Sequence, residues 1–376
     1  MQQLKRNTIA LSLAHATFAQ FILLGSGAAM AQEAAATDAA KPAAEQMDRI
    51  VVTATRRNTF VQETPLAVTA FNQDTLQNNQ VKDLASLATM VPSLVVEQHG
   101  DSGGVHVYMR GVGSANHTEL GDPAVAFYVD GVYSPRPQGA TALMYDLSHV
   151  EVARGPQGTL NGRNSTAGAV NLVSAAPNTS KFMGSAGITV GDYRHLQTQG
   201  MINIPFSDDV ALRIAAIKDS HDGTVDFRRG SNVMPGTAKY GAGDQMGVRA
   251  SLLWKFTPQL RGTFIADYFL DQGAGNVYLA AEPKSGEKLR SALIDTPGTL
   301  DQSILTYKGK LNYKPTEALD FTYLGSWSRY KRQNSNDADA GLFPGFKSEN
   351  RTDWAQFDSY SHELQARSDD DAPFQW

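Results

Sequence analysis

The residues most able to bind or react lie in one stretch, Val150 to Pro177. Its loop, which contains the letters GPQGTLNGRNS, combines glycines with polar side chains: Gly155, Gly158, Gly162, Gly168, Arg154, Asn161, Arg163 and Asn164. Glycine permits positive φ angles and close backbone approach, so a loop of this kind either holds a ligand or forms a tight turn between two strands. Both alternatives stay open on these residues alone.

Three patterns that would indicate catalysis or metal binding are incomplete. The glycine-rich loop lacks the G-K-[ST] ending of a phosphate-binding loop. His362 and Glu363 are followed by Ala366, where an H-E-x-x-H zinc motif needs a second histidine. His117 lies near Glu119 but has no further ligands beside it. We therefore expect no catalytic residue, no metal site and no enzyme.

Composition narrows the protein class. The chain has 376 residues, a formal net charge of -5, 33 glycines, 13 tyrosines and no cysteine. The glycine and tyrosine counts favour a turn-rich β protein over a helical enzyme. An acidic balance predicts no surface for nucleic acid. The absence of cysteine excludes disulfides, thiolate nucleophiles and cysteine-ligated metals.

The N-terminus has the pattern of a secretory signal peptide, residues 1–31. Lys5 and Arg6 precede an apolar run from Ile9 to Leu24, and small residues follow up to Ala31. The alternative is a membrane anchor, although polar residues interrupt the run. Residues 32–57 form an alanine-rich linker that ends in a β-prone run. Such a run is either the first strand of a domain or a segment that a partner captures by strand addition.

Residues 58–181 read as a small α+β domain. Apolar spacing predicts a helix in the later part of Asn72–Val91, which Pro92 ends. Short strands are predicted at Val105–Arg110 and Ala124–Asp130.

Residues 182–376 alternate apolar and polar side chains over long segments. Val248–Phe256, Leu260–Leu270 and Tyr307–Lys314 are examples, and about eight such strands follow one another. Short polar turns alternate with long connections, such as Gln272–Leu300 and Gln333–Asp353. This arrangement is typical of an outer-membrane β-barrel. A soluble β-sandwich also alternates, but strands of this length and loops this unequal disfavour it.

Five motifs in order carry a resemblance to one family. They are IVVTA (Ile50–Ala54), TPLAVTAF (Thr64–Phe71), VYMRGVG (Val107–Gly113), FYVDGV (Phe127–Val132) and VEVARGPQGTLNGRNSTAGAVNLVS (Val150–Ser174). Together they span nearly all of Ile50–Pro177, and the sequence resembles the TonB-dependent outer-membrane receptor family. The resemblance implies an α+β plug domain followed by the first part, about eight strands, of an antiparallel transmembrane β-barrel.

The resemblance also implies partners and a location. The protein would lie in the outer membrane of a Gram-negative bacterium, in contact with its lipid, after a cleaved signal peptide has directed export. TonB, with its inner-membrane energising complex, would bind Ile50, Val51, Val52, Thr53 and Ala54. The cargo would be a small molecule or metal chelate, first of all a ferric siderophore, with no resident cofactor.

Because a plugged transporter barrel has 22 strands, we expect a truncated receptor. The alternative is a non-transporting fragment that binds a ligand or signals.

The resemblance assigns two further groups of residues. Arg110 and Arg154 match plug positions that pair with barrel glutamates, for which Glu363 is the best candidate, because a buried charge needs a partner. Apical plug loops would contact the ligand through Tyr133, Arg136, Gln138, Asn161 and Arg163.

Overall fold

The computed structural model describes residues 50–53, 56–57, 59–98, 105–114, 121–134, 144–227, 241–274, 291–292, 298–337, 350–369, 374 and 376. The predicted signal peptide and most of the linker lie outside these residues. Within the described part, no helix is long and apolar enough to cross a membrane.

The first half of the described chain is built on a five-stranded mixed sheet with the order β3-β8-β9-β6-β7. Only β6 and β9 pair in parallel. The strands are β3 (Val68–Asn72), β6 (Val125–Val129), β7 (Val132–Ser134), β8 (Leu147–Arg154) and β9 (Gly168–Ser174). Two small antiparallel pairs and four short helices accompany them: β1 (Val51–Val52) with β2 (Thr59–Phe60), β4 (Leu94–Gln98) with β5 (Val105–Met109), η2 (Val61–Glu63), α2 (Gln73–Asn78), α3 (Leu84–Ala88) and α4 (Gly158–Asn161).

The helix predicted in the later part of Asn72–Val91 is α3, and a second short helix, α2, precedes it. The Asn72 side chain accepts a hydrogen bond from the Thr75 N–H and starts α2, and Asp83 forms a capping box with Ser86 at the start of α3. Between them Gln80 adopts a φ of 53°, a left-handed conformation that no helix continues through. The apolar spacing nevertheless places Leu84 and Leu87 fully inside the core, each with 0% exposure.

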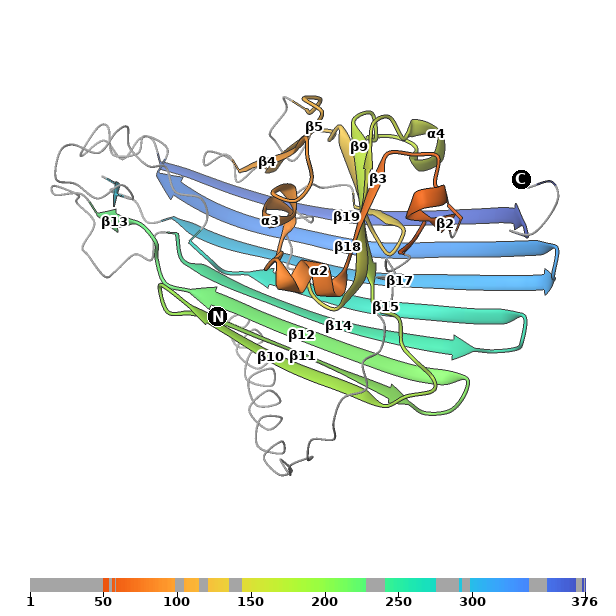
Figure 1. Ribbon diagram of the computed structural model, residues 1–376. Helices are drawn as coiled ribbons and strands as arrows, with labels where there is room; N and C mark the ends of the chain where they lie inside the picture. The colour runs from red at the N-terminus through yellow and green to blue at the C-terminus, as the bar shows by residue number, and fades with distance from the viewer. Residues whose placement is uncertain are drawn as a thin grey trace, which may run out of the picture. The chain divides into compact units, whose positions relative to one another are not determined.

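The second half forms one eight-stranded antiparallel sheet, with the order β10-β11-β12-β14-β15-β17-β18-β19 (Figure 1). Its strands are β10 (Met183–Gly191), β11 (His195–Pro205), β12 (Val210–His221), β14 (Gly243–Lys255), β15 (Leu260–Asp271), β17 (Thr299–Thr316), β18 (Leu319–Asp337) and β19 (Asn350–Ser368). A separate parallel pair joins β13 (Asp226–Phe227) to β16 (Ser291–Ala292). β18 continues to Asp337, so part of the connection predicted from Gln333 is strand.

The two faces of this sheet differ in polarity, and the exposed face is the apolar one. Outward side chains of β19 are large and exposed, with Trp354 at 80%, Tyr360 at 73% and Leu364 at 76%. On the opposite face, Arg213 and Lys308 are each 7% exposed. Apolar residues outside and polar residues inside are the alternation of a membrane β-barrel strand. We call the polar face the lumen face. The predicted fold class, a plug followed by about eight barrel strands, is confirmed.

The plug core leaves no room for a side chain at Gly168. A Cβ atom there would lie 2.5 Å from the carbonyl oxygen of Ala153 and 2.3 Å from the sulfur of Met109. Met109 can move, but the Ala153 backbone is fixed in the β8–β9 ladder. We expect Gly168→Ala to lower the free energy of plug unfolding by about 1–3 kcal/mol, measured as the urea midpoint in detergent. Gly158→Ala, where a Cβ meets nothing within 4 Å, is the control and should leave the midpoint unchanged.

Candidate functional site

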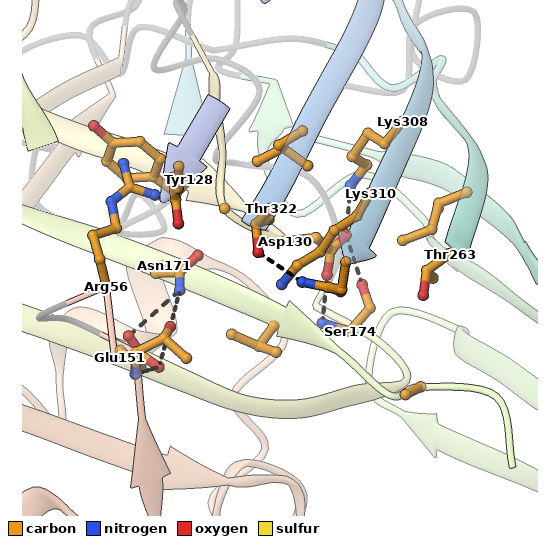
Figure 2. Close-up of a pocket in the computed structure, with 18 of the residues that line it drawn as sticks. Arg56, Tyr128, Asp130, Glu151, Asn171, Ser174, Thr263, Lys308, Lys310 and Thr322 are labelled. Carbon is orange, nitrogen blue, oxygen red and sulfur yellow. Dashed lines mark hydrogen bonds and ion pairs between the residues drawn. The ribbon is translucent and has the colours of Figure 1, made fainter. Parts of the chain in front are cut away.

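A cavity of about 300 Å³ lies between the plug and the lumen face of the sheet (Figure 2). Thr53, Asp130 and Glu151 line it from the plug side. The opposite side of the cavity is the lumen face of the eight-stranded sheet, which we call the wall. It is basic, with Arg261, Lys308, Lys310 and Arg367. The cavity therefore joins the segment predicted to bind TonB to the barrel wall.

The buried carboxylate of Glu151 anchors that segment. Glu151 is 2% exposed and accepts hydrogen bonds from the Thr53 backbone N–H at 2.7 Å and the Thr53 hydroxyl at 3.0 Å. The Nε2 atom of His149 lies 2.9 Å from the same carboxylate oxygen. Asn171, the cross-strand neighbour of Glu151 on β9, donates to its other oxygen at 3.4 Å. Thr53 is thus tied to the centre of the plug sheet.

The strand just before Thr53 is half committed to the plug. Val52 is fully buried against Val68 and Ala153, whereas Val51 is 42% exposed. β1 pairs only with β2 in a two-stranded sheet, so its other edge has no strand partner in the described part of the chain. An edge strand of this kind is a template for strand addition. Ala54, also predicted to bind TonB, lies outside the described residues.

Two arginines that follow this strand hold the chain against the wall. Arg56, in a left-handed conformation with a φ of 62°, places its Nη2 atom 3.6 Å from a carboxylate oxygen of Glu363. Arg57 donates to the hydroxyl of Ser368 at 3.1 Å. Arg367 in turn donates to the backbone carbonyl of Arg56 at 3.3 Å. An ion pair and hydrogen bonds therefore join the end of β19 to the start of the plug.

A carboxylate of the plug neutralises the centre of the wall. Asp130 and Gly131, with φ angles of 55° and 81°, form the tight turn between β6 and β7. The turn directs Asp130 at the wall, where Lys308 lies 2.6 Å away and the Ser174 N–H donates at 2.8 Å. Burial alone would raise the pKa of Asp130, but the charges of Lys308 and Arg249, with these hydrogen bonds, lower it to about 2.

A second plug carboxylate binds further along the sheet. Asp146, just before β8, accepts two hydrogen bonds from Arg213, one of them 2.8 Å long from Nε. Both side chains are more than nine-tenths buried. Nearby, Arg249 donates to the Tyr145 carbonyl at 3.3 Å and lies 4.8 Å from the centre of the Tyr145 ring. Wall cations bound by plug groups therefore dominate the interface.

The ion pairs between plug and wall differ from those predicted from the sequence. Glu363 contacts Arg56 rather than Arg110 or Arg154, and within the described residues neither of those two forms an ion pair. Arg154 keeps its Nε atom buried without a hydrogen-bond partner in the described part of the chain. The physical reason is the register between plug and wall, which brings plug acids, not plug arginines, to the buried wall. The Asp130-Gly131 turn signal was in the sequence and could have identified one of these acids.

The predicted ligand-contacting residues separate into two places. Tyr133 and Arg163 lie together, with the guanidinium 5.8 Å from the ring centre, and line a second cavity of about 490 Å³. Asn161 instead lines the first cavity beside Arg367, near the short turns, and its carbonyl accepts a hydrogen bond from Tyr128 at 2.6 Å. The apical placement of Asn161 is therefore wrong, because α4 folds back toward Arg56. Arg136 and Gln138 lie outside the described residues.

Among the described residues, no three histidine, aspartate or glutamate side chains are grouped so that they could hold a metal ion. The chemistry of the cavity is that of ion pairing and hydrogen bonding.

Comparison with known proteins agrees with this architecture. Residues 61–169 match the family model described as TonB-dependent Receptor Plug Domain. The match identifies this part of the chain as the plug domain of a TonB-dependent receptor. The receptor is 32% identical over 132 residues to the pesticin receptor of Yersinia pestis, an alignment that covers 35% of this chain and 19% of that protein. It is 24% identical over 196 residues to the probable TonB-dependent siderophore receptor PiuA of Acinetobacter baumannii, which covers 50% of this chain and 25% of that protein.

Solved structures share the fold. The ferric yersiniabactin uptake receptor FyuA from Yersinia pestis superposes with a TM-score of 0.69 at 21% identity, over 82% of this chain and 46% of that one. PiuA from Acinetobacter baumannii gives a TM-score of 0.64 at 17% identity, over 82% and 43%. The receptor chain thus spans less than half the length of these relatives. The likeness to TonB-dependent receptors indicates a location in the outer membrane of a Gram-negative bacterium.

The lowered pKa of Asp130 predicts a pH dependence of receptor stability. A carboxylate whose folded pKa is depressed stabilises the fold above its ordinary pKa of 3.8, and that contribution is lost as the pH falls toward about 2. Asp130→Asn should therefore destabilise the plug by about 2 kcal/mol at pH 7 and by almost nothing near pH 2. The measurement is the urea midpoint of tyrosine circular dichroism across this range. A difference that stayed constant with pH would refute the assignment.

Two ion pairs of the interface should differ sharply in a double-mutant cycle. Asp146 and Arg213 are buried and doubly hydrogen-bonded, so Asp146→Asn alone should cost about 3–5 kcal/mol because it leaves Arg213 uncompensated. Arg56 and Glu363 keep 25% and 35% exposure, so their coupling should stay below about 1 kcal/mol. Urea unfolding of the single and double variants gives both energies. Equal couplings would contradict the arrangement of the interface.

Proposed function

We propose that the protein is a TonB-dependent transporter that takes up a ferric siderophore across the outer membrane. The observation that carries the proposal is the position of the Ile50–Thr53 segment. It forms an edge strand at the plug surface and is fastened through Thr53 and Glu151 to a plug that packs on the lumen face of membrane strands. A partner that adds a strand to β1 would therefore be able to transmit a pulling force to the plug.

The hydrogen-bond pattern supports a stepwise pull. Tension on β1 first breaks its two-residue pairing with β2, then the Thr53–Glu151 hydrogen bonds. The Arg56–Glu363 and Arg57–Ser368 contacts follow along the chain, and the Asp130–Lys308 and Asp146–Arg213 pairs hold the rest of the plug to the wall. Each contact is lost singly, so the peak force stays below that needed to break all of them together.

The names of the relatives support an iron chelate as cargo. The aligned proteins include a probable siderophore receptor and a ferric-pyoverdine receptor, and the FyuA structure is that of a ferric yersiniabactin uptake receptor. A vitamin B12 transporter from Vibrio vulnificus also aligns, at 29% identity over 139 residues. Export through the signal peptide at residues 1–31 and capture of the segment through Ala54 by TonB belong to the same proposal.

Deletion of Ile50–Thr53 tests the proposal. In iron-starved cells, the deletion should abolish accumulation of radioactive iron supplied as ferric yersiniabactin or ferric pyoverdine, and cell-surface binding of the same chelates should persist. Loss of TonB from the host should have the same effect. Uptake that survived the deletion would overturn the role of this segment.

A matched pair of single substitutions separates strand pairing from side-chain chemistry. Val51→Pro removes a backbone donor and should reduce uptake by about tenfold or more, because proline cannot pair in a central strand. Val51→Thr keeps the β-branched shape and should transport normally. Equal uptake by the two variants would show that β1 is not captured as a strand.

A further inference from the structure

We propose that the wall of the first cavity carries a binding site for a small polyanion, formed by Arg261, Lys310 and Arg367. The site is distinct from the segment that pairs with TonB and from the Tyr133–Arg163 cavity. It lies toward the short-turn ends of β15, β17 and β19, on the lumen face.

Strand register brings these cations together. Lys310 on β17 pairs with Thr263 on β15, and Arg261 is two residues away on the same face, a diagonal neighbour. Arg367 on β19 lines the same cavity. Both arginines lie close enough to act electrostatically on Lys310, as do the acids Asp130 and Asp320. Figure 2 shows Lys308 and Lys310 extending from one strand toward the plug.

The charges that line the cavity do not balance. Five of the lining side chains are cationic, namely Arg56, Arg261, Lys308, Lys310 and Arg367, and only two, Asp130 and Glu151, are acidic. Three of the cations have carboxylate partners: Arg56 has Glu363, Lys308 has Asp130, and Arg367 has Asp320. Within the described residues, Arg261 and Lys310 have neither an ion-pair nor a hydrogen-bond partner. Asp130 and Asp320 act on Lys310 only through space, so the cavity keeps an excess of positive charge that attracts an anion.

The lining defines the chemistry of the ligand. Guanidinium groups bind carboxylates and phosphates through paired hydrogen bonds, and the ammonium of Lys310 adds a point charge. The neutral liners Asn312, Thr322 and Gln365 supply further hydrogen-bonding groups. A cavity of about 300 Å³ suits an anion of the size of citrate. This identification, which rests on the proposed function, makes the anion the negatively charged chelator of the cargo as it passes between plug and wall.

Calorimetric titration of the detergent-solubilised full chain with citrate tests the site. Wild-type protein should bind citrate with an affinity that falls as salt rises. Arg261→Gln and Lys310→Gln should each weaken binding about tenfold, the loss expected for one charge-assisted contact. Lys310→Arg keeps the charge and should bind within about threefold of wild type. Near-ultraviolet circular dichroism of each variant verifies that the fold is kept.

Lys331 supplies the matched control. Its side chain lies on β18 and is exposed on the outward face of the sheet, opposite the face that lines the cavity. Lys331→Gln should therefore leave citrate binding unchanged. The proposal is overturned if wild type fails to bind citrate, if Arg261→Gln and Lys310→Gln bind as wild type does, or if Lys331→Gln weakens binding equally. Because binding is measured without transport, loss of the proposed uptake function would leave this result standing, and the converse holds as well.

Discussion

The structure depends on one constraint: the eight-stranded sheet turns large apolar side chains outward and buries charged side chains on its inner face. Trp354, Tyr360 and Leu364 are exposed on one face, and Arg213 and Lys308 are buried on the other. Lipid does not solvate a charge, so the charged side chains that are buried on the inner face must find their partners on the lumen side. Some pair within the sheet, such as Arg367 with Asp320, and the plug supplies the partners of Arg213 and Lys308. Its packing against the wall is therefore decided by charge as well as by shape.

The plug supplies acidic side chains from turns in which the aspartate itself has a left-handed backbone conformation. Asp130 and Asp146 both have positive φ angles, 55° and 50°, and each projects from a sharp turn toward a wall cation. The compensation is incomplete near the short turns, where Arg261 and Lys310 face the cavity without partners in the described part of the chain. The same cavity contains Thr53, the anchored end of the proposed TonB-binding strand. A force on that strand would thus act at the edge of the most weakly neutralised region of the interface.

Local patterns predicted much of this architecture. Period-two alternation identified β14, β15 and β17, and motif order identified the plug, because both are written within short segments of chain. The partner of Glu363 was not predictable in the same way, since it depends on how the plug sits in register with β19. Helix α2 was not predicted, because it is a single short segment with one buried apolar residue, Leu76. The Asp130-Gly131 pair predicts a tight turn between two strands. It does not predict that Lys308 lies opposite the aspartate, because that contact depends on how the plug packs on the sheet.

The docking of plug acids on the lumen face is the central claim, and the absence of native cysteine makes it directly measurable. Cysteines placed at Asp146 and Arg213 should be joined efficiently by a short bifunctional thiol reagent in outer-membrane preparations. A cysteine at Leu212, one residue away on the outward face of β12, should not be joined to the cysteine at Asp146. Selective linkage of the first pair is the predicted result. Equal linkage of both pairs, or linkage of neither, would contradict the account.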